Sequence, residues 1–203
     1  NRNEKIKNFL LENKKSLIIS LTLVILVVIS FFFYKAYKES NNEKLSEKYN
    51  SVIINYEIKD KPEIILSMKE IINHKDSTYS PLALYFLIDN NLIDNKDEVN
   101  ILFDVLIDKT SLEFEIKNLI IYKKALYNAD FIDENGLLKI LKPLINSESA
   151  WKSHALFLIA EYFYSKNEKE KSKEFFDQII NTKNANEDIV KEAQKRLIRD
   201  LSE

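Results

Sequence analysis

The side chains best suited to acid–base or metal chemistry in this sequence are two histidines, His74 and His154. An imidazole titrates near neutral pH and binds metals, but either role needs a second, positioned partner group. His74 lies in a polar stretch, His154 lies beside an apolar stripe, and the two are too far apart to form a ligand pair on one helix. We therefore interpret both histidines as structural residues.

Paired carboxylates are the other groups that could exchange protons. They occur at Asp94/Asp97, Asp97/Glu98 and Asp133/Glu134, each at the expected start of a helix. A carboxylate in that position accepts hydrogen bonds from exposed backbone amides and complements the positive end of the helix dipole. Helix capping is therefore the simpler interpretation of these pairs.

Four serines are candidate nucleophiles by residue type alone: Ser77, Ser80, Ser149 and Ser153. A serine nucleophile needs an adjacent base and an oxyanion site. The sequence offers no such arrangement around these residues, which have simpler interpretations as helix caps or loop residues.

The composition excludes further chemistry. The chain has no cysteine, so thiolate catalysis, disulfides and zinc–thiolate sites are excluded. Gly136 is its only glycine, so glycine-rich phosphate loops and dinucleotide fingerprints are absent. The formal net charge of -2 gives no basic field for nucleic acid. We predict a protein that is not an enzyme, with no cofactor, no nucleic-acid partner and no small-molecule substrate.

The element that organises the chain is an uncharged apolar run from Ser16 to Tyr34. A helix rises about 1.5 Å per residue, so this run nearly matches a hydrocarbon core about 30 Å thick. We predict a tail at 1–15, a transmembrane helix at 16–34 that contacts the lipid bilayer, and a domain at 35–203. The alternatives are a buried helix of a soluble core and a cleaved signal peptide. The run is longer than a usual signal core, and no small-x-small cleavage site follows it.

The charges beside the apolar run predict its orientation. Residues 1–15 contain five Lys and Arg residues, and the stretch from Lys35 to Lys48 contains four. This bias favours a cytoplasmic N-terminus with the large domain on the other side of the membrane. An aromatic group from Phe31 to Tyr37 is typical of the second membrane interface.

The rest of the chain has helical periodicity, and scarce Gly and Pro disfavour a β-rich fold. We expect the first helix to continue to about Ile58, followed by seven more helices and a closing one. Their expected ranges are 62–72, 80–93, 97–108, 112–129, 137–145, 151–164, 172–180 and 187–202. The expected start signals are Pro62, Ser80-Pro81, Asp94 or Asn95, Thr110 with Ser111, and Asn186. We expect Pro143 to kink or shorten its helix, and Asn167 to adopt the left-handed conformation in a tight turn.

The spacing of the expected caps indicates a repeat. Ser80, Ser111 and Ser149 are separated by 31 and 38 residues, which averages about 34. That period is typical of helix-turn-helix solenoids of the tetratricopeptide class. The sequence therefore predicts an all-α fold: four degenerate helix pairs and a C-terminal capping helix with a charged outer face.

The segment from Trp151 to Phe176 resembles a degenerate tetratricopeptide unit. The family's Leu-Gly pair falls on Ile159-Ala160, its large aromatic residue on Phe163, its small residue on Ser172 and its later aromatic residue on Phe176. Alanine in place of the family's glycine still permits close helix contact. The earlier pairs match this pattern poorly.

The layout of the whole chain is similar to that of the YfgM-like family. It shares a basic tail, one span, a degenerate repeat domain and a closing helix over Asp188–Leu197, and the segment Leu138–Leu197 resembles alphaproteobacterial members. The resemblance implies a bacterial inner-membrane protein with a periplasmic domain that is an ancillary subunit of the SecYEG translocon. It also implies a membrane-anchored periplasmic chaperone of the prolyl-isomerase type as a partner, and a role in handling newly translocated proteins.

Tyrosines are the candidate contact residues of such a scaffold, because solenoids bind partners on extended concave surfaces. Tyr122 and Tyr164 fall off the main apolar stripes, so we predict them as a partner-binding surface. Core packing is the alternative for all the tyrosines. For function, the alternative with the same fold is an adaptor in envelope assembly or cell division.

Overall fold

The computed structural model describes residues 11, 13–57 and 60–201. The tail predicted at 1–15 lies largely outside the described residues, and so does the end expected for the first helix at Ile58. The chain forms two compact units, Asn1–Ser51 and Val52–Glu203, and each is described by itself.

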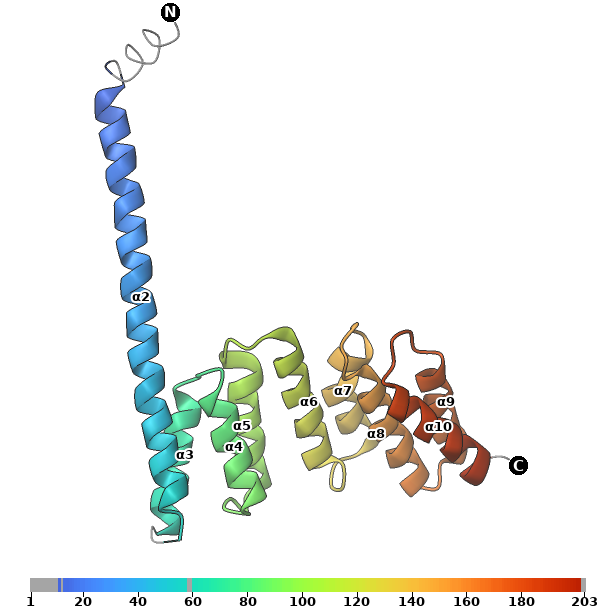
Figure 1. Cartoon of the computed structure of the whole chain (residues 1–203). Helices are drawn as coiled ribbons and strands as arrows, with labels where there is room; N and C mark the ends of the chain where they lie inside the picture. Colours follow the sequence, from blue (N-terminus) through green and yellow to red (C-terminus); the bar gives the residue numbers. More distant parts are fainter. Residues whose placement is uncertain (1–10, 12, 58–59, 202–203) are drawn as a thin grey trace, which may run out of the picture. The chain divides into compact units, whose positions relative to one another are not determined.

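The first unit is built on the long helix α2 (Lys14–Ile54), which contains the whole apolar run (Figure 1). Within the described residues, α2 is the one helix long and apolar enough to cross a membrane. Its apolar side chains are exposed from Ile18 to Phe33, and the Thr22 hydroxyl donates a 2.9 Å hydrogen bond to the carbonyl of Ile18. As predicted, the helix continues well beyond residue 34.

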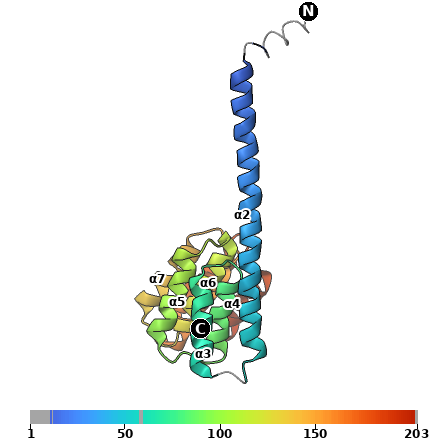
Figure 2. The same ribbon diagram turned by 90° about the vertical axis from the view of Figure 1, so that its left-hand side faces the viewer.

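The second unit is all-helical in its described part, as predicted (Figure 1). Figure 2 views the same helices from a quarter turn away, where they overlap. Their bounds are α3 (Lys61–Asn73), α4 (Tyr79–Asp89), α5 (Lys96–Lys109), α6 (Phe114–Asn128), α7 (Glu134–Ile145), α8 (Lys152–Ser165), α9 (Lys169–Ile180) and α10 (Glu187–Asp200). The α3–α10 order gives the expected run of helical hairpins with a closing helix.

Several helix starts follow the predicted side-chain chemistry. The Asn95 side chain caps α5 by accepting from the amides of Asp97 and Glu98, and Asn186 caps α10 in the same way. Asp133 caps α7 by accepting from the Gly136 amide at 2.8 Å. The acidic groups Asp97, Glu98, Asp133 and Glu134 all lie at these helix N-termini, which confirms their placement.

The prediction that the Ser80 hydroxyl caps the start of the helix is wrong. Helix α4 begins at Tyr79, and Ser80 is fully buried inside it. Its hydroxyl donates to the carbonyl of Ile71 and accepts from the Asp76 amide, both at 2.9 Å. Asp76 instead accepts from the amides that open the helix, those of Thr78 and Tyr79.

Other boundaries differ from the prediction: α7 and α9 each begin three residues earlier than expected, and two further differences have a local cause. Helix α4 ends at Asp89 and not near Ile93, because Asn91 adopts a positive φ of 50° and turns the chain. Helix α6 begins at Phe114, because Thr110 closes the preceding helix: its hydroxyl donates to the carbonyl of Val105 at 3.1 Å. Threonine competes for backbone groups at both ends of a helix, so its residue type does not reveal which end it occupies.

The tight turn between α8 and α9 was predicted correctly. Asn167 has a φ of 62°, and the chain reverses over 166–168. Pro143 lies in the last turn of α7, which ends at Ile145.

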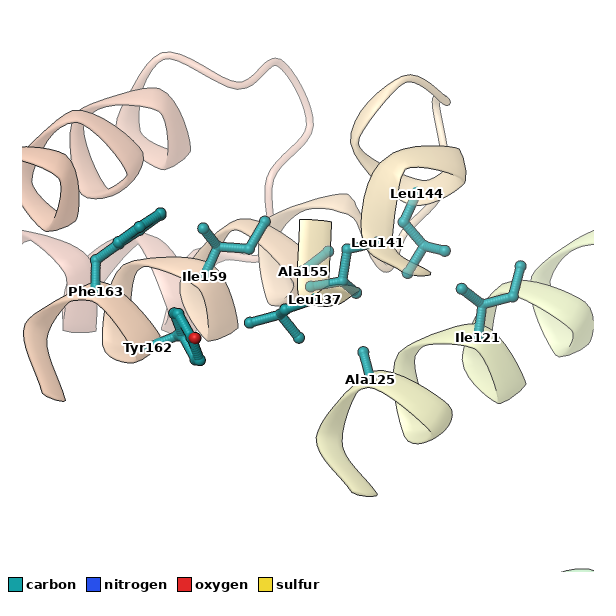
Figure 3. Close-up of a cluster of buried hydrophobic side chains, with 9 residues drawn as sticks. All are labelled: Ile121, Ala125, Leu137, Leu141, Leu144, Ala155, Ile159, Tyr162 and Phe163. Atoms are coloured by element: carbon teal, nitrogen blue, oxygen red, sulfur yellow. The ribbon is translucent and has the colours of Figure 1, made fainter. Parts of the chain in front are cut away.

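The core of the second half lies where α6, α7 and α8 meet (Figure 3). It contains nine buried side chains: Ile121, Ala125, Leu137, Leu141, Leu144, Ala155, Ile159, Tyr162 and Phe163. Small residues from α6 and α8, Ala125 and Ala155, lie among the larger aliphatic ones. This is the interlocking of large and small groups that dense packing requires. The core fixes the surfaces of α6 and α8 described below.

Candidate partner-binding surface

The surface that could bind a partner lies along the helices with even numbers, α4, α6 and α8, with α10 at the end. Its first part is the α4–α6 groove, a pocket of about 410 Å³ between these two helices. The groove is lined by Ser77, Thr78, Pro81, Leu82, Tyr85, Leu112, Glu113, Ile116, Leu119 and Ile120. Leu82 is 41% exposed and Ile116 is 40% exposed, so apolar side chains meet solvent on both sides of it.

Tyr85 gives the α4–α6 groove its one distinctive polar group. The ring is half-buried, and the ammonium of Lys123 lies 5.2 Å from its centre. Burial, with a smaller contribution from Asp89, raises the pKa of Tyr85 to about 12. The phenol is therefore neutral at physiological pH and can donate one hydrogen bond, yet its buried oxygen has no hydrogen-bond partner among the described residues.

The second part is an aromatic cluster of Tyr122, Trp151 and His154, between α6 and the start of α8. Tyr122 stacks on Trp151 with ring centres 5.6 Å apart, and its edge-to-face contact with His154 is 5.8 Å. Tyr122 is half-buried and also packs against the core of Figure 3. One part of Tyr122 therefore packs against the core, and the rest is exposed to solvent, where a partner could contact it.

Burial is the main reason why the pKa of His154 lies below its usual value, and a contact with the Ala150 backbone partly opposes it. The imidazole is therefore neutral at pH 7, as an aromatic packing partner of Trp151, 5.0 Å away. Among the described residues, no group of three or more possible metal ligands occurs. This placement matches the structural interpretation of His154.

Tyr164, the other predicted contact residue, lies on α8 beneath the closing helix. The guanidinium of Arg196 lies 4.4 Å from the centre of its ring. Arg196 also forms a two-pronged ion pair with Glu161, at 2.7 and 2.8 Å, and a close one with Asp200. A guanidinium over an aromatic face is attractive, so Tyr164 helps to hold α10 on α8. Tyr164 is half-buried and packs against the core between α8, α9 and α10, so only part of it is left for a partner.

An exposed apolar stripe on α6 was not predicted. Ile116 and Leu119 have core spacing in the sequence, but they line the groove, and Leu126 further along is 43% exposed. The apolar residues of α6 that are buried are Ile120, Ile121 and Ala125. Because α6 is apolar on most of its surface, periodicity alone does not show which stripe faces the core.

The remaining serines connect successive hairpins. Ser149 donates to the carboxylate of Glu115 at 2.8 Å, and the Ala150 amide donates to the other oxygen of that carboxylate at 3.3 Å. One hairpin later, Ser153 accepts from the Asn186 amide at 3.3 Å. Glu115 and Ser153 are the second residues of α6 and α8, so the link to the next hairpin starts from the same helix position in both cases. Ser149 is a loop residue, as the sequence predicted, whereas Ser153 lies buried inside α8 and is neither a cap nor a loop residue.

Comparison with known families supports the helical-repeat architecture. The model of the tetratricopeptide repeat-like domain matches residues 7–97. No curated protein and no solved structure matches the chain. The matched part contains α2, α3 and α4, whereas the tetratricopeptide pattern read from the sequence lies at Trp151–Phe176, outside the match. A tetratricopeptide-like domain indicates a scaffold for protein–protein interaction, which agrees with the candidate surface.

Proposed function

We propose that this protein is a non-enzymatic scaffold anchored in the bacterial inner membrane, which binds protein partners at the Sec translocon. The observation that carries the proposal is the apolar length of α2, which belongs to the same chain as a tetratricopeptide-like stack. An uncharged helix with apolar side chains exposed on all sides is stable in lipid, where its backbone groups are paired within the helix.

Anchoring explains how such a scaffold can act with weak contacts. A domain held at the membrane meets other membrane proteins at a high effective concentration. The stack offers a surface that is already folded, so binding orders little new structure. The proposed partners are the translocon and a membrane-anchored periplasmic chaperone of the prolyl-isomerase type, as the YfgM-like resemblance implies. The proposed contact surface contains Tyr122, Tyr164 and the α4–α6 groove.

A cysteine at Lys166 tests the proposed topology, because the chain has no other cysteine. Lys166 is exposed just after α8. The variant Lys166→Cys is expressed in cells whose outer membrane is opened, and a thiol reagent that cannot cross the inner membrane is added. We expect labelling of Lys166→Cys and none of the matched Lys5→Cys variant in the tail. The reverse pattern would place the stack in the cytoplasm and would refute the translocon proposal.

A crosslinking experiment then tests the partners. A photoreactive group is attached to Lys123→Cys beside the α4–α6 groove, or to Lys142→Cys on α7 as the control. Both side chains lie in the second unit on accessible helix surfaces. We expect translocon subunits or the chaperone to be captured from position 123 and not from position 142. Capture of division or envelope-assembly proteins from position 123 would favour the adaptor function instead.

A further inference from the structure

A second apolar pocket is lined by two helices with odd numbers, α5 and α7, together with α6. This α5–α7 groove has a volume of about 550 Å³, and its apolar lining consists of Ile107, Ile121, Ile132, Ile140 and Pro143. Ile121 belongs to the core of Figure 3, and the other three isoleucines are half-buried and pack against that core. The core therefore holds the apolar floor of the groove in place before any partner binds.

Most of the polar side chains that line the α5–α7 groove already have a partner. The side-chain amides of Asn100 and Asn128 donate to each other's oxygen at 2.9 and 2.8 Å. Lys124 forms a close ion pair with Asp104. These four side chains join α5 to α6, so a ligand would have to break these contacts to use them.

Two charged side chains on different walls of the groove have no such contact. Asp108 is exposed on α5, and Lys139 is exposed on α7. In the part of the chain that the structure describes, neither forms an ion pair or a side-chain hydrogen bond. The groove therefore has an acidic wall at Asp108 and a basic wall at Lys139, with the isoleucine floor between them.

The neighbouring junctions between odd-numbered helices show charges that are paired directly. Lys69 of α3 pairs closely with Glu98 of α5, and Lys171 of α9 pairs with Glu134 of α7 at 2.9 Å. Over the described residues, no hydrogen bond or ion pair joins α5 to α7. A partner in the groove can supply both missing contacts, with a cation for the acidic wall and a carboxylate for the basic wall.

We propose that the α5–α7 groove binds an amphipathic helix of a partner protein, whose apolar stripe has basic side chains on one flank and acidic side chains on the other. A helix places apolar residues on one face with charged residues on both sides of it. An extended strand alternates its side chains between two faces and cannot present this pattern. The groove is separate from the surface along α4, α6 and α8, so the scaffold can hold a second protein there.

The two charged walls also determine the direction of the bound helix. Turning the helix end for end keeps its apolar stripe on the isoleucine floor but exchanges its two flanks. One direction alone therefore brings the basic flank to Asp108 and the acidic flank to Lys139. Charges at the edge of an interface fix the orientation of the partner, whereas the apolar floor contributes most of the affinity.

Designed peptides test the proposal on the full chain in lipid nanodiscs, where no detergent competes for the apolar floor. Three peptides of about 14 residues, roughly 21 Å long as helices, share leucines at positions i, i+3, i+7 and i+10. The mixed peptide has lysines on one flank and glutamates on the other, the second has lysines on both flanks, and the third has glutamates on both. Binding is measured by fluorescence anisotropy, and empty nanodiscs report binding to the lipid alone.

We expect the mixed peptide to bind about two- to fivefold more tightly than either of the others, as exposed ion pairs allow. Asp108→Lys and Lys139→Glu should each weaken its binding by a similar factor. The matched control exchanges the same charges outside the groove, at Asp177 on α9 and Lys142 on α7, which are both exposed. Asp177→Lys with Lys142→Glu should leave the affinity unchanged. Circular dichroism confirms that each variant is folded.

The double variant Asp108→Lys with Lys139→Glu should bind the mixed peptide with the original affinity but in the opposite direction. A nitroxide on the peptide N-terminus and another on Lys109→Cys, at the end of α5 in a chain without other cysteines, report this direction. Reversal should change their distance, measured by pulsed electron paramagnetic resonance, because it moves the labelled end by roughly 20 Å. Equal affinities of the three peptides, no saturable binding of the mixed peptide, or an unchanged direction in the double variant would overturn the proposal.

Discussion

The α4–α6 and α6–α8 junctions repeat the same step of the stack but are built differently. Between α6 and α8, a buried core, an aromatic cluster and the Glu115 hydrogen bonds fill the space. Between α4 and α6, the equivalent space is a pocket with exposed Leu82 and Ile116 on its walls. Stability in such a solenoid is approximately a sum over neighbouring repeats, so one weak interface can concentrate motion and binding without unfolding the rest. The following predictions test this difference.

The largest expected effect is at the α6–α8 junction, where the core fills the space between the helices. Phe163 is 1% exposed and stacks on Phe175 with ring centres 5.5 Å apart. Phe163→Ala should lower the free energy of unfolding by about 3–5 kcal/mol, because it removes buried area and leaves a cavity. The measurement is urea unfolding of the full chain in micelles. Phe114→Ala, at a phenylalanine that is 60% exposed on α6, is the matched control and should cost less than about 0.5 kcal/mol. Equal losses would show that the α6–α8 core is not the stabilising element.

The next effect concerns the amide pair of Asn100 and Asn128, between α5 and α6. Asn128→Ala leaves the half-buried Asn100 amide without its partner, so we expect a loss of about 1–3 kcal/mol. Replacing both residues by leucine removes both polar groups together and should cost less than Asn128→Ala. Unfolding free energies of the double variant, of Asn100→Leu and of Asn128→Leu complete a double-mutant cycle. If the double variant cost the sum of the two single leucine variants, the amides would act independently and not as a coupled pair.

A smaller effect is expected from the link across the α6–α8 junction. Glu115 is exposed, so Glu115→Ala should cost about 0.5–1 kcal/mol. The effect on hydrogen exchange should be larger than the effect on the free energy of unfolding. The Ala150 amide loses its acceptor, so its hydrogen exchange should accelerate several-fold. Glu115→Gln retains an acceptor oxygen and should lose less protection. Unchanged exchange in Glu115→Ala would show that this contact does not hold the α8 N-terminus.

The sequence predicted the parts of this architecture that depend on local chemistry. Caps at Asn95, Asp133 and Asn186, and the turn at Asn167, use side chains that act on their own backbone neighbours. The difference between the two junctions could not be predicted, because it depends on which stripe of α6 meets which neighbour. The predictions for Ser80 and Thr110 were wrong for a related reason. The Ser80 hydroxyl donates to a carbonyl of α3, and the Thr110 hydroxyl donates to a carbonyl of the helix that it ends. Neither acceptor can be identified from the sequence. The partner-binding roles of Tyr122 and Tyr164 stay predictions.

Alkaline pH should affect the α4–α6 junction through Tyr85. The pKa of Tyr85 is raised from 10.0 to about 12, so the folded chain holds this proton more tightly than the unfolded chain. The resulting stability is fully present below pH 10 and is lost as pH rises from 10 towards 12. Tyr85→Phe removes this contribution, so its melting temperature should fall less steeply than that of the wild type over this range. Parallel pH profiles of the two proteins would contradict the burial of this phenol.

Acid pH should lower the stability of the α6–α8 junction, and this is the smallest effect that we expect. Burial against Trp151 lowers the pKa of His154 below 6.5, so the unfolded chain binds this proton more readily than the folded one. The associated stability is fully present above pH 6.5 and is lost as pH falls through the lowered folded value. His154→Gln cannot titrate, so its melting temperature should decrease less than that of the wild type between pH 7.5 and 5.5. Alkali acts on both junctions, because burial also raises the pKa of Tyr122 in the aromatic cluster, whereas acid acts on that cluster through His154.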